Sequence, residues 1–434
     1  MTKPAASQAE RRPTDWKSAG MQKRIRRRYA AERRFRMLGA GAVILSAAFL
    51  GFLLLTMVAQ GWRGFTVTEI ALPIDLKVAG LKVERAQLAT PAADLALAGA
   101  GLEDAVENAA IRAFGAEGGT YLAPSAWLAV REAVKRDPSL LENRAIVHVP
   151  AATGFDQALA GDGDAAMEAG VARLRRQGAI ARDFNWAFLH ESDSTDPVAV
   201  GIWGALKGSL LTMAITFLIA FPVGVLSAIY LEEYAPKNRW TDLIEVSINN
   251  LAAVPSIIFG LLGLAVFLGT WQIGGHVYGP MLPRSAPLVG GVTLALMIMP
   301  VIVIASRNAI KGVPPSIRDA ALGIGASPIQ VVFHHVLPLA MPGILTGTII
   351  GMARALGETA PLLLIGMRAF IVTAPGGFTD PATVLPVQIF LWSDEVSRGF
   401  VEKTSAAILV LLAVLLAMNG LAIYLRNKFE TRWQ

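Results

Sequence analysis

The chain has 434 residues, enough for more than one domain, and a formal net charge of +6. Hydrophobic residues make up 54% of it and charged residues 17%, and the mean hydropathy is +0.50. This composition is typical of a membrane protein with a substantial soluble part. The sequence contains no cysteine, which excludes a disulfide framework, a thiolate metal site and a cysteine nucleophile.

Residues 1–36 form a basic tail in which lysine and arginine outnumber acidic residues. Such a run can bind nucleic acid, but this one directly precedes an apolar segment, residues 37–59, so membrane orientation explains it better and we expect no nucleic-acid partner. The apolar segment is too long for a signal-peptide core, and no cleavage pattern follows it closely. We therefore expect a first transmembrane helix over residues 37–59, with the basic tail in the cytoplasm and the next residues exported.

Residues 60–200 are predicted to form a periplasmic domain that mixes helices and strands. Alternating apolar residues from Ile70 to Val78 predict a half-buried strand, and residues 145–149 a second one. Helical patterns follow over residues 102–114, 125–136 and 165–177. His148 and His190 have no partner at ligand spacing, so we expect surface or structural roles for both and no metal site. The domain is predicted to act as a spacer or a contact surface.

Residues 201–425 are predicted to form a core of five further spans. These spans cover residues 202–230, 243–269, 288–305, 343–367 and 404–425, with a kink at Pro255 in the second of them. Arg307, Lys311 and Arg318 follow the 288–305 span, which places the loop of residues 311–342 in the cytoplasm. Basic residues in the tail 426–434 place that end inside as well. The predicted fold is thus an all-α polytopic membrane protein with six spans and an α+β domain inserted after the first.

The span of residues 343–367 contains only two ionisable side chains, Arg354 and Glu358. Arg354 lies roughly 16 Å along a helix from Gly343, too deep to reach a headgroup layer easily. A spacing of four places both groups on one helix face, where they can pair. Such a pair can merely fix the packing. We favour a substrate pathway, because a guanidinium offers a planar set of donors that suits an oxyanion.

The loop of residues 311–342 is predicted to fold as two short helices around a bend. An alanine-rich segment stops at Gly325, and Ser327-Pro328 starts a second helix with an apolar stripe. An ordinary amphipathic loop between spans is one interpretation. A docking element for another subunit is the one we favour, and its candidate contact residues are Asp319, Ala320, Ala321, Gly325, Leu337 and Pro338.

This loop resembles the cytoplasmic coupling loop of ABC importer permeases, in which Glu-Ala-Ala is followed by Gly and then by Ile-x-Leu-Pro. Asp319 stands here in place of the glutamate, and His335 in place of an apolar residue. Further blocks resemble the PstA-type permease of the bacterial phosphate-specific ABC importer. They are GIWGALKGSLLTM at 201–213, FPVGVLSAIYLEEYAPKNRW at 221–240, LAAVPSIIFGLLGLAVF at 251–267 and ARALGETAPLL at 353–363.

The resemblance covers residues 201 to about 425. It implies a type I ABC importer permease fold, a bacterial inner-membrane location and a role for Arg354 and Glu358 in phosphate passage. It also implies three partners, which are a homologous PstC-type permease, an ATPase dimer and a periplasmic phosphate-binding protein. The predicted spans add membrane lipid as a fourth partner. The sequence has no G-x-x-x-x-G-K-[ST] motif, so we expect no cofactor in this chain and place ATP with magnesium in the partner ATPase.

Other functions stay open at this point. The oxyanion can be sulfate or molybdate, and a proton-coupled carrier can use Glu358 as its titrating group. A membrane-anchored sensor acting through residues 60–200 leaves five spans without a purpose. An intramembrane hydrolase lacks its expected H-E-x-x-H or G-x-S-x-G motif. We therefore predict a transport subunit with no catalytic residues.

Overall fold

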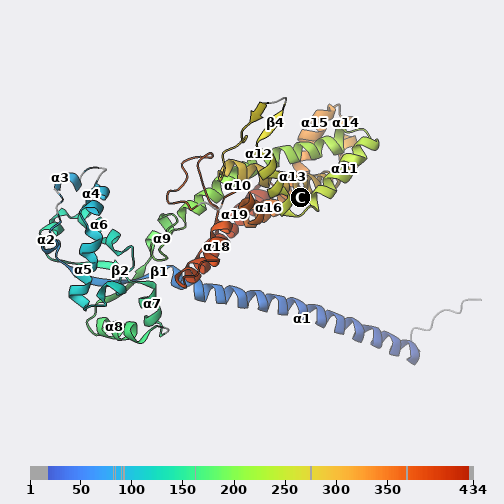
Figure 1. The fold of residues 1–434 in the computed structure, drawn as a ribbon. Coiled ribbons are helices and arrows are strands. Elements are labelled where there is room, and N and C mark those ends of the chain that lie inside the picture. The colour runs from blue at the N-terminus through green and yellow to red at the C-terminus, as the bar shows by residue number, and fades with distance from the viewer. Residues whose placement is uncertain are drawn as a thin grey trace, which may run out of the picture. The chain divides into compact units, whose positions relative to one another are not determined.

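The structure is a computed structural model that describes residues 18–429, except 82, 84, 89, 91–92, 162, 274–275 and 368–369. Parts of both predicted tails, residues 1–17 and 430–434, therefore lie outside the described residues. The chain divides into two units, Met1–Val58 and Ala59–Gln434, and each is described by itself. Most of helix α1, Ala19–Gly64, belongs to the first unit (Figure 1).

A small antiparallel sheet organises the part of the second unit between α1 and α10. Its strand order is β2 (Ala145–Pro150), β1 (Thr66–Ile74), β3 (Ile180–Phe184). Alternate residues of β1 are buried, including Ile70 and Leu72, which confirms the predicted strand. The strand ends earlier than predicted, because the Asp75 side chain accepts a hydrogen bond from the backbone N–H of Val78 and starts a helix there.

Short helices surround this sheet and complete its apolar core. They are α2 (Leu76–Ala79), α3 (Arg85–Leu88), α4 (Ala93–Gly99), α5 (Leu102–Phe114), α6 (Ala126–Arg136), α7 (Thr153–Leu159), α8 (Ala165–Arg176) and α9 (Trp186–His190), with the 3-10 turns Gly118–Tyr121 and Pro138–Leu141. The core includes Leu97, Val130 and Phe155, none of which is accessible to solvent. The predicted mixture of helices and strands is therefore present in this part of the chain.

Five described helices are long and apolar enough to cross a membrane, and a sharply bent helix pair can provide a sixth span. The five are α1, α10 (Trp203–Ile229, extended by the π-helical turn Tyr230–Tyr234), α13 (Pro287–Lys311), α16 (Leu337–Gly357, preceded by α15, Pro328–Gln330, and the π-helical turn Val331–Val336) and α19 (Gly399–Phe429). The remaining elements of this part are α14 (Pro315–Gly323), α17 (Ala360–Leu364), α18 (Leu385–Ser393) and a hairpin of β4 (Trp271–Ile273) and β5 (His276–Tyr278).

One predicted span has the bend expected at Pro255, and another breaks where the sequence suggested a continuous helix. The span of residues 243–269 is the bent pair α11 (Arg239–Ala252) and α12 (Ser256–Phe267), which meet at 104°. Pro255 lies in the break, since proline disfavours helical backbone in the residue before it. The span of residues 343–367 breaks after Gly357, because Pro361 has no N–H to bond the Gly357 carbonyl and its ring would clash with it in a helix.

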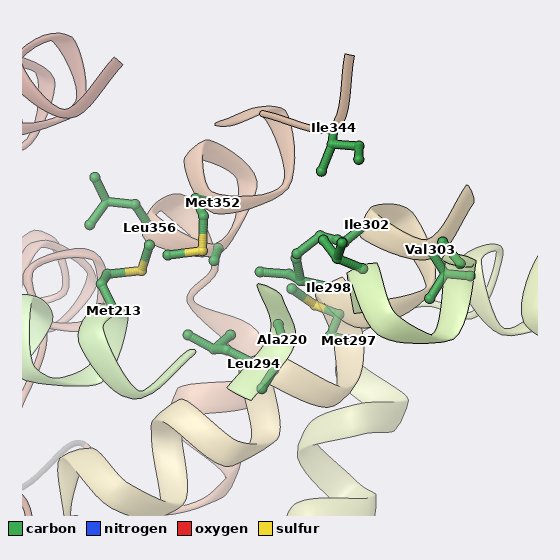
Figure 2. Packing of buried hydrophobic residues seen from close by; sticks show 14 of the residues in the cluster. Met213, Ala220, Leu294, Met297, Ile298, Ile302, Val303, Ile344, Met352 and Leu356 are labelled. Atoms are coloured by element: carbon green, nitrogen blue, oxygen red, sulfur yellow. The ribbon is translucent and has the colours of Figure 1, made fainter. Parts of the chain in front are cut away.

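The membrane core is built from α10, α13 and α16. Figure 2 shows buried side chains of this core, among them Met213 and Ala220 of α10, Leu294, Ile298 and Ile302 of α13, and Ile344, Met352 and Leu356 of α16. Two glycines of α16 allow its close approach to α13, since a Cβ on Gly347 would lie 2.1 Å from the Cβ of Ala305 and one on Gly343 2.7 Å from that of Ala309. This packing fixes the position of α16, which carries Arg354.

The end of α1 packs on α19. A Cβ on Gly61 would lie 2.6 Å from Leu409 Cδ1, and one on Gly64 2.5 Å from the carbonyl oxygen of Glu402. Lys403 Nζ donates a hydrogen bond of 2.9 Å to the Gly64 carbonyl oxygen. The two helices are therefore joined at the point where the chain leaves α1 for β1.

Candidate functional site

Arg354 and Glu358 form an ion pair across the end of α16, with Arg354 Nε 3.3 Å from Glu358 Oε1. The prediction that both lie on one helix face is wrong, because α16 ends at Gly357 and Glu358 has extended backbone with ψ 124°. The carboxylate instead reaches back to the guanidinium from the segment between α16 and α17. The pair was predicted, but its geometry was not.

The guanidinium faces away from the core of this chain. The Arg354 side chain is 48% exposed and that of Glu358 is 17% exposed, whereas Ala355 and Leu356 are buried. Within the described residues, Nε is the only guanidinium nitrogen of Arg354 with a hydrogen-bond partner. The two terminal nitrogens can therefore donate to a group outside this chain's own core, such as an oxyanion.

The loop of residues 311–342 has the predicted bend. Helix α14 ends at Gly323, and Gly325 has φ +89°, a left-handed conformation that favours glycine. Ser327 then starts α15 with a reciprocal cap, in which Ser327 N donates to Gln330 Oε1 at 2.9 Å and Gln330 N donates to Ser327 Oγ at 3.4 Å. The alanine-rich helix, the glycine and the second helix start are all confirmed.

The loop has several apolar side chains that are exposed on the surface of the chain. They are Leu322, Ile324, Ile329 and Phe333, of which Ile324 is the most accessible at 83%. Among the predicted contact residues, Asp319, Ala320, Gly325 and Pro338 are exposed and Leu337 is half-buried. Ala321 is only 4% exposed because it packs into the membrane core. Its side chain therefore holds α14 in place and offers little surface to a partner.

An ion-pair network that sequence reasoning missed ties this loop to two other helices. Arg318 at the start of the loop lies 2.7 Å from Glu233 Oε1 and also donates to the carbonyl oxygens of Val313 and Ile310, at 2.7 and 3.0 Å. Arg307 of α13 pairs with Glu232, and its second terminal nitrogen lies 2.8 Å from Glu245 Oε2 of α11.

The signal for this network was present in the sequence. Glu232 and Glu233 end one span, and basic residues end the next span on the same predicted side of the membrane. Those basic residues were interpreted only as markers of orientation.

Within the described residues, no group of three or more histidine, aspartate or glutamate side chains could hold a metal ion.

Comparisons with known proteins give two family matches. Residues 220–431 match the family described as "Binding-protein-dependent transport system inner membrane component". Residues 22–169 match a "Domain of unknown function (DUF3333)". The first match covers the end of α10 (residues 220–229) and α11 to α19, and hence Arg354, Glu358 and the loop.

Three relatives each match about half of the chain or slightly more. A "Probable ABC transporter permease protein YqgI" of Bacillus subtilis (strain 168) is 31% identical over 217 residues, which are 48% of this chain and 70% of the relative. The "Phosphate transport system permease protein PstA" of Yersinia pestis is 30% identical, covering 51% and 71%. The "Phosphate transport system permease protein PstC" of Haemophilus influenzae (strain ATCC 51907 / DSM 11121 / KW20 / Rd) is 30% identical, covering 58% and 82%.

A solved structure of the MetNI methionine ABC transporter in an inward-facing conformation also matches, with a TM-score of 0.39 and 18% identity. The match covers 53% of this chain and 98% of that one.

Proposed function

The chain belongs to the PstA-type permeases of phosphate ABC importers, and on this premise we propose that Arg354 and Glu358 line the phosphate path and that residues 311–342 dock on a separate ATPase. As a member of that family it is a multi-pass inner-membrane transport subunit and not an enzyme.

The observation that carries the proposal is the half-exposed guanidinium of Arg354, held by one nitrogen to Glu358. An arginine cannot lose its charge in a protein, and its planar fork suits a tetrahedral oxyanion. A passing phosphate would compete with the Glu358 carboxylate for the same donors. The carboxylate would also repel the anion, so the site would hold phosphate briefly and release it, as conduction requires.

The docking proposal is supported by the exposed apolar residues of the loop and by its attachment. Leu322, Ile324 and Ile329 are exposed on a segment held by a left-handed glycine and a capped helix start. Arg318 attaches the start of that segment to Glu233 at the end of α10, and α10 packs on α13 in the membrane core. A displacement of the loop by the ATPase would therefore move α10 and α13 with it.

We further propose the partners and the orientation that this role requires. A PstC-type permease would complete the path, an ATPase dimer would bind ATP with magnesium, and a periplasmic phosphate-binding protein would deliver the anion. Residues 1–36 and 426–434 would lie in the cytoplasm, and residues 60–200 in the periplasm. An excess of basic residues before the first apolar segment and after the last one supports this orientation.

The test is uptake by the reconstituted importer. The chain is expressed with its ATPase, PstC-type permease and binding protein in cells that lack other phosphate importers, and uptake of labelled phosphate, sulfate and molybdate is compared. We expect phosphate uptake that needs ATP and survives a protonophore. Uptake that collapses with the proton gradient while ATP is maintained would favour a proton-coupled carrier, and loss of the ATPase on copurification would contradict the docking proposal.

A further inference from the structure

A cavity of about 580 Å³ lies between the soluble domain and the start of α19. Its walls come from four parts of the chain: the connection from α1 to β1, the segment from α7 to β3, residues 197–198 before α10, and residues 398–403 at the start of α19. We call it the outer basic pocket, and its charged lining residues are Arg63, Asp156, Arg175, Arg182, Arg398, Glu402 and Lys403. Small-molecule sites commonly have volumes of about 300–1,000 Å³.

Positive charge dominates this pocket. Among the described lining residues, five side chains are cationic and two are carboxylates. One carboxylate, Glu402, already lies 4.0 Å from Arg63 Nη1. Burial raises the pKa of the other, Asp156, which makes its charged form less favourable. The pocket therefore has a cationic excess that its own acids do not balance.

Lys403 is the most enclosed of these cations, at 6% exposure. Its Nζ donates to the Gly64 carbonyl oxygen at 2.9 Å and lies 5.2 Å from the centre of the Phe188 ring. Both partners are uncharged, and within the described residues no carboxylate lies within ion-pair distance of Lys403. Burial lowers the pKa of Lys403 to about 8, while the carboxylates of Glu402, Asp156 and Asp196 favour its charged form. An anion bound beside this enclosed ammonium would stabilise the charged form further.

Close contacts and a hydrogen bond hold the walls of the pocket together. A Cβ on Gly399 would lie 2.8 Å from Pro197 Cβ and 3.0 Å from Thr153 Cγ2, so α19 begins directly against the domain. The backbone N–H of Ser125 donates to Asp196 Oδ2 at 3.0 Å, which attaches the domain to the segment that precedes α10. The cations are thus carried on parts of the chain that are fixed to one another.

We propose that the outer basic pocket binds a phosphate group, from either free inorganic phosphate or the headgroup of an anionic phospholipid. Arginine pairs with phosphate through two parallel hydrogen bonds, and a lysine adds a point charge. None of the lining residues belongs to the proposed path at Arg354, so this is a second anion site with its own residues.

The experiment places a fluorescent reporter at the pocket. Ala160 lines the pocket and is exposed, and because the chain has no cysteine, Ala160→Cys takes a single environment-sensitive label. The labelled full chain is titrated with inorganic phosphate in detergent. In parallel, it is placed in nanodiscs of phosphatidylcholine alone or mixed with phosphatidylglycerol, without inorganic phosphate.

Two double variants distinguish binding at the pocket from a non-specific effect of the chain's positive charge. Arg175 and Arg182 are exposed lining residues, and the Arg175→Gln, Arg182→Gln double variant should weaken the response about tenfold or more, as expected for lost charge-assisted hydrogen bonds. The matched control is the Arg136→Gln, Arg176→Gln double variant, which removes the same charge from exposed positions outside the pocket and should change the response less than about twofold. If the first double variant does not fold, its two single variants take its place.

Each outcome decides the proposal. A response to inorganic phosphate assigns the free anion, and a response only to phosphatidylglycerol assigns the headgroup. No response in either arm, or equal weakening by the control variant, overturns it. Arg354→Gln should leave the reporter response unchanged, so failure at this pocket and failure of the proposed path are separable.

Discussion

Arg354→Gln should abolish most phosphate transport while leaving the protein almost as stable as before. Removing one partner of a buried ion pair costs about 3–5 kcal/mol, because the other charge stays buried and unpaired. An exposed pair contributes only about 0.2–1 kcal/mol. The Arg354 side chain is 48% exposed and bonds Glu358 through one nitrogen, so we expect the lower range. The unfolding midpoint should then fall by no more than about 2–4 °C.

The effect on transport should be much larger. A hydrogen bond to a charged group contributes about 1.5–3 kcal/mol, so losing the guanidinium should reduce uptake by about tenfold or more. Arg354→Lys keeps the charge but loses the planar fork, so its loss should be partial. Uptake of labelled phosphate by the assembled importer is compared with thermal unfolding of the same purified complex, and Arg239→Gln, an exposed arginine at the start of α11, is the matched control.

Two results would refute this reasoning. Wild-type uptake by an assembled Arg354→Gln importer would mean that the guanidinium does not contact the anion. A loss of several kcal/mol in stability, with uptake falling only as the amount of folded protein falls, would mean that the pair is a packing device.

Three further predictions follow from other parts of the chain. Gly325→Ala should destabilise the loop by about 1–2 kcal/mol, because Gly325 has a φ of +89°, and should reduce uptake per ATP hydrolysed. Gly323→Ala is the control in the same loop and should be neutral, since a Cβ has no close neighbour at either position. Equal effects of the two variants would contradict the left-handed bend. Single cysteines at the exposed Ala169 and Ser316 should be labelled from outside only and inside only, respectively, and external labelling at Ser316 in intact cells would refute the orientation. Burial raises the pKa of Asp193, so the folded protein holds this proton more tightly than the unfolded chain, and stability should fall as pH rises from about 3.9 through the raised pKa. Asp193→Asn should flatten that part of a thermal unfolding series, and an unchanged slope would contradict the assignment.

Local signals in the sequence were sufficient for the local features. The alternation in β1, the bend at Gly325 and the helix start at Ser327 each depend on a few neighbouring residues, and all three are present. The Arg354–Glu358 pair was also accessible, because two charges in one apolar segment are conspicuous.

Features that depend on distant contacts were not accessible in the same way. The 104° angle between α11 and α12 exceeds an ordinary proline kink, and the sequence pattern does not determine it. The break after Gly357 depends on the clash that Pro361 would cause, which the apolar pattern concealed. The pair Arg318–Glu233 joins residues 85 positions apart, and its geometry depends on how three helices pack.

The contact between α1 and α19 has a consequence for biosynthesis. The hydrogen bond from Lys403 to Gly64 joins residues 339 positions apart, and the glycine surface at Gly61 and Gly64 is covered only when α19 is in place. During synthesis the end of α1 therefore stays without its packing partner until α19 has been made. The domain between α1 and α10 has its own apolar core and can fold as it emerges. A chain truncated before α19 would therefore leave the surface at Gly61 and Gly64 uncovered.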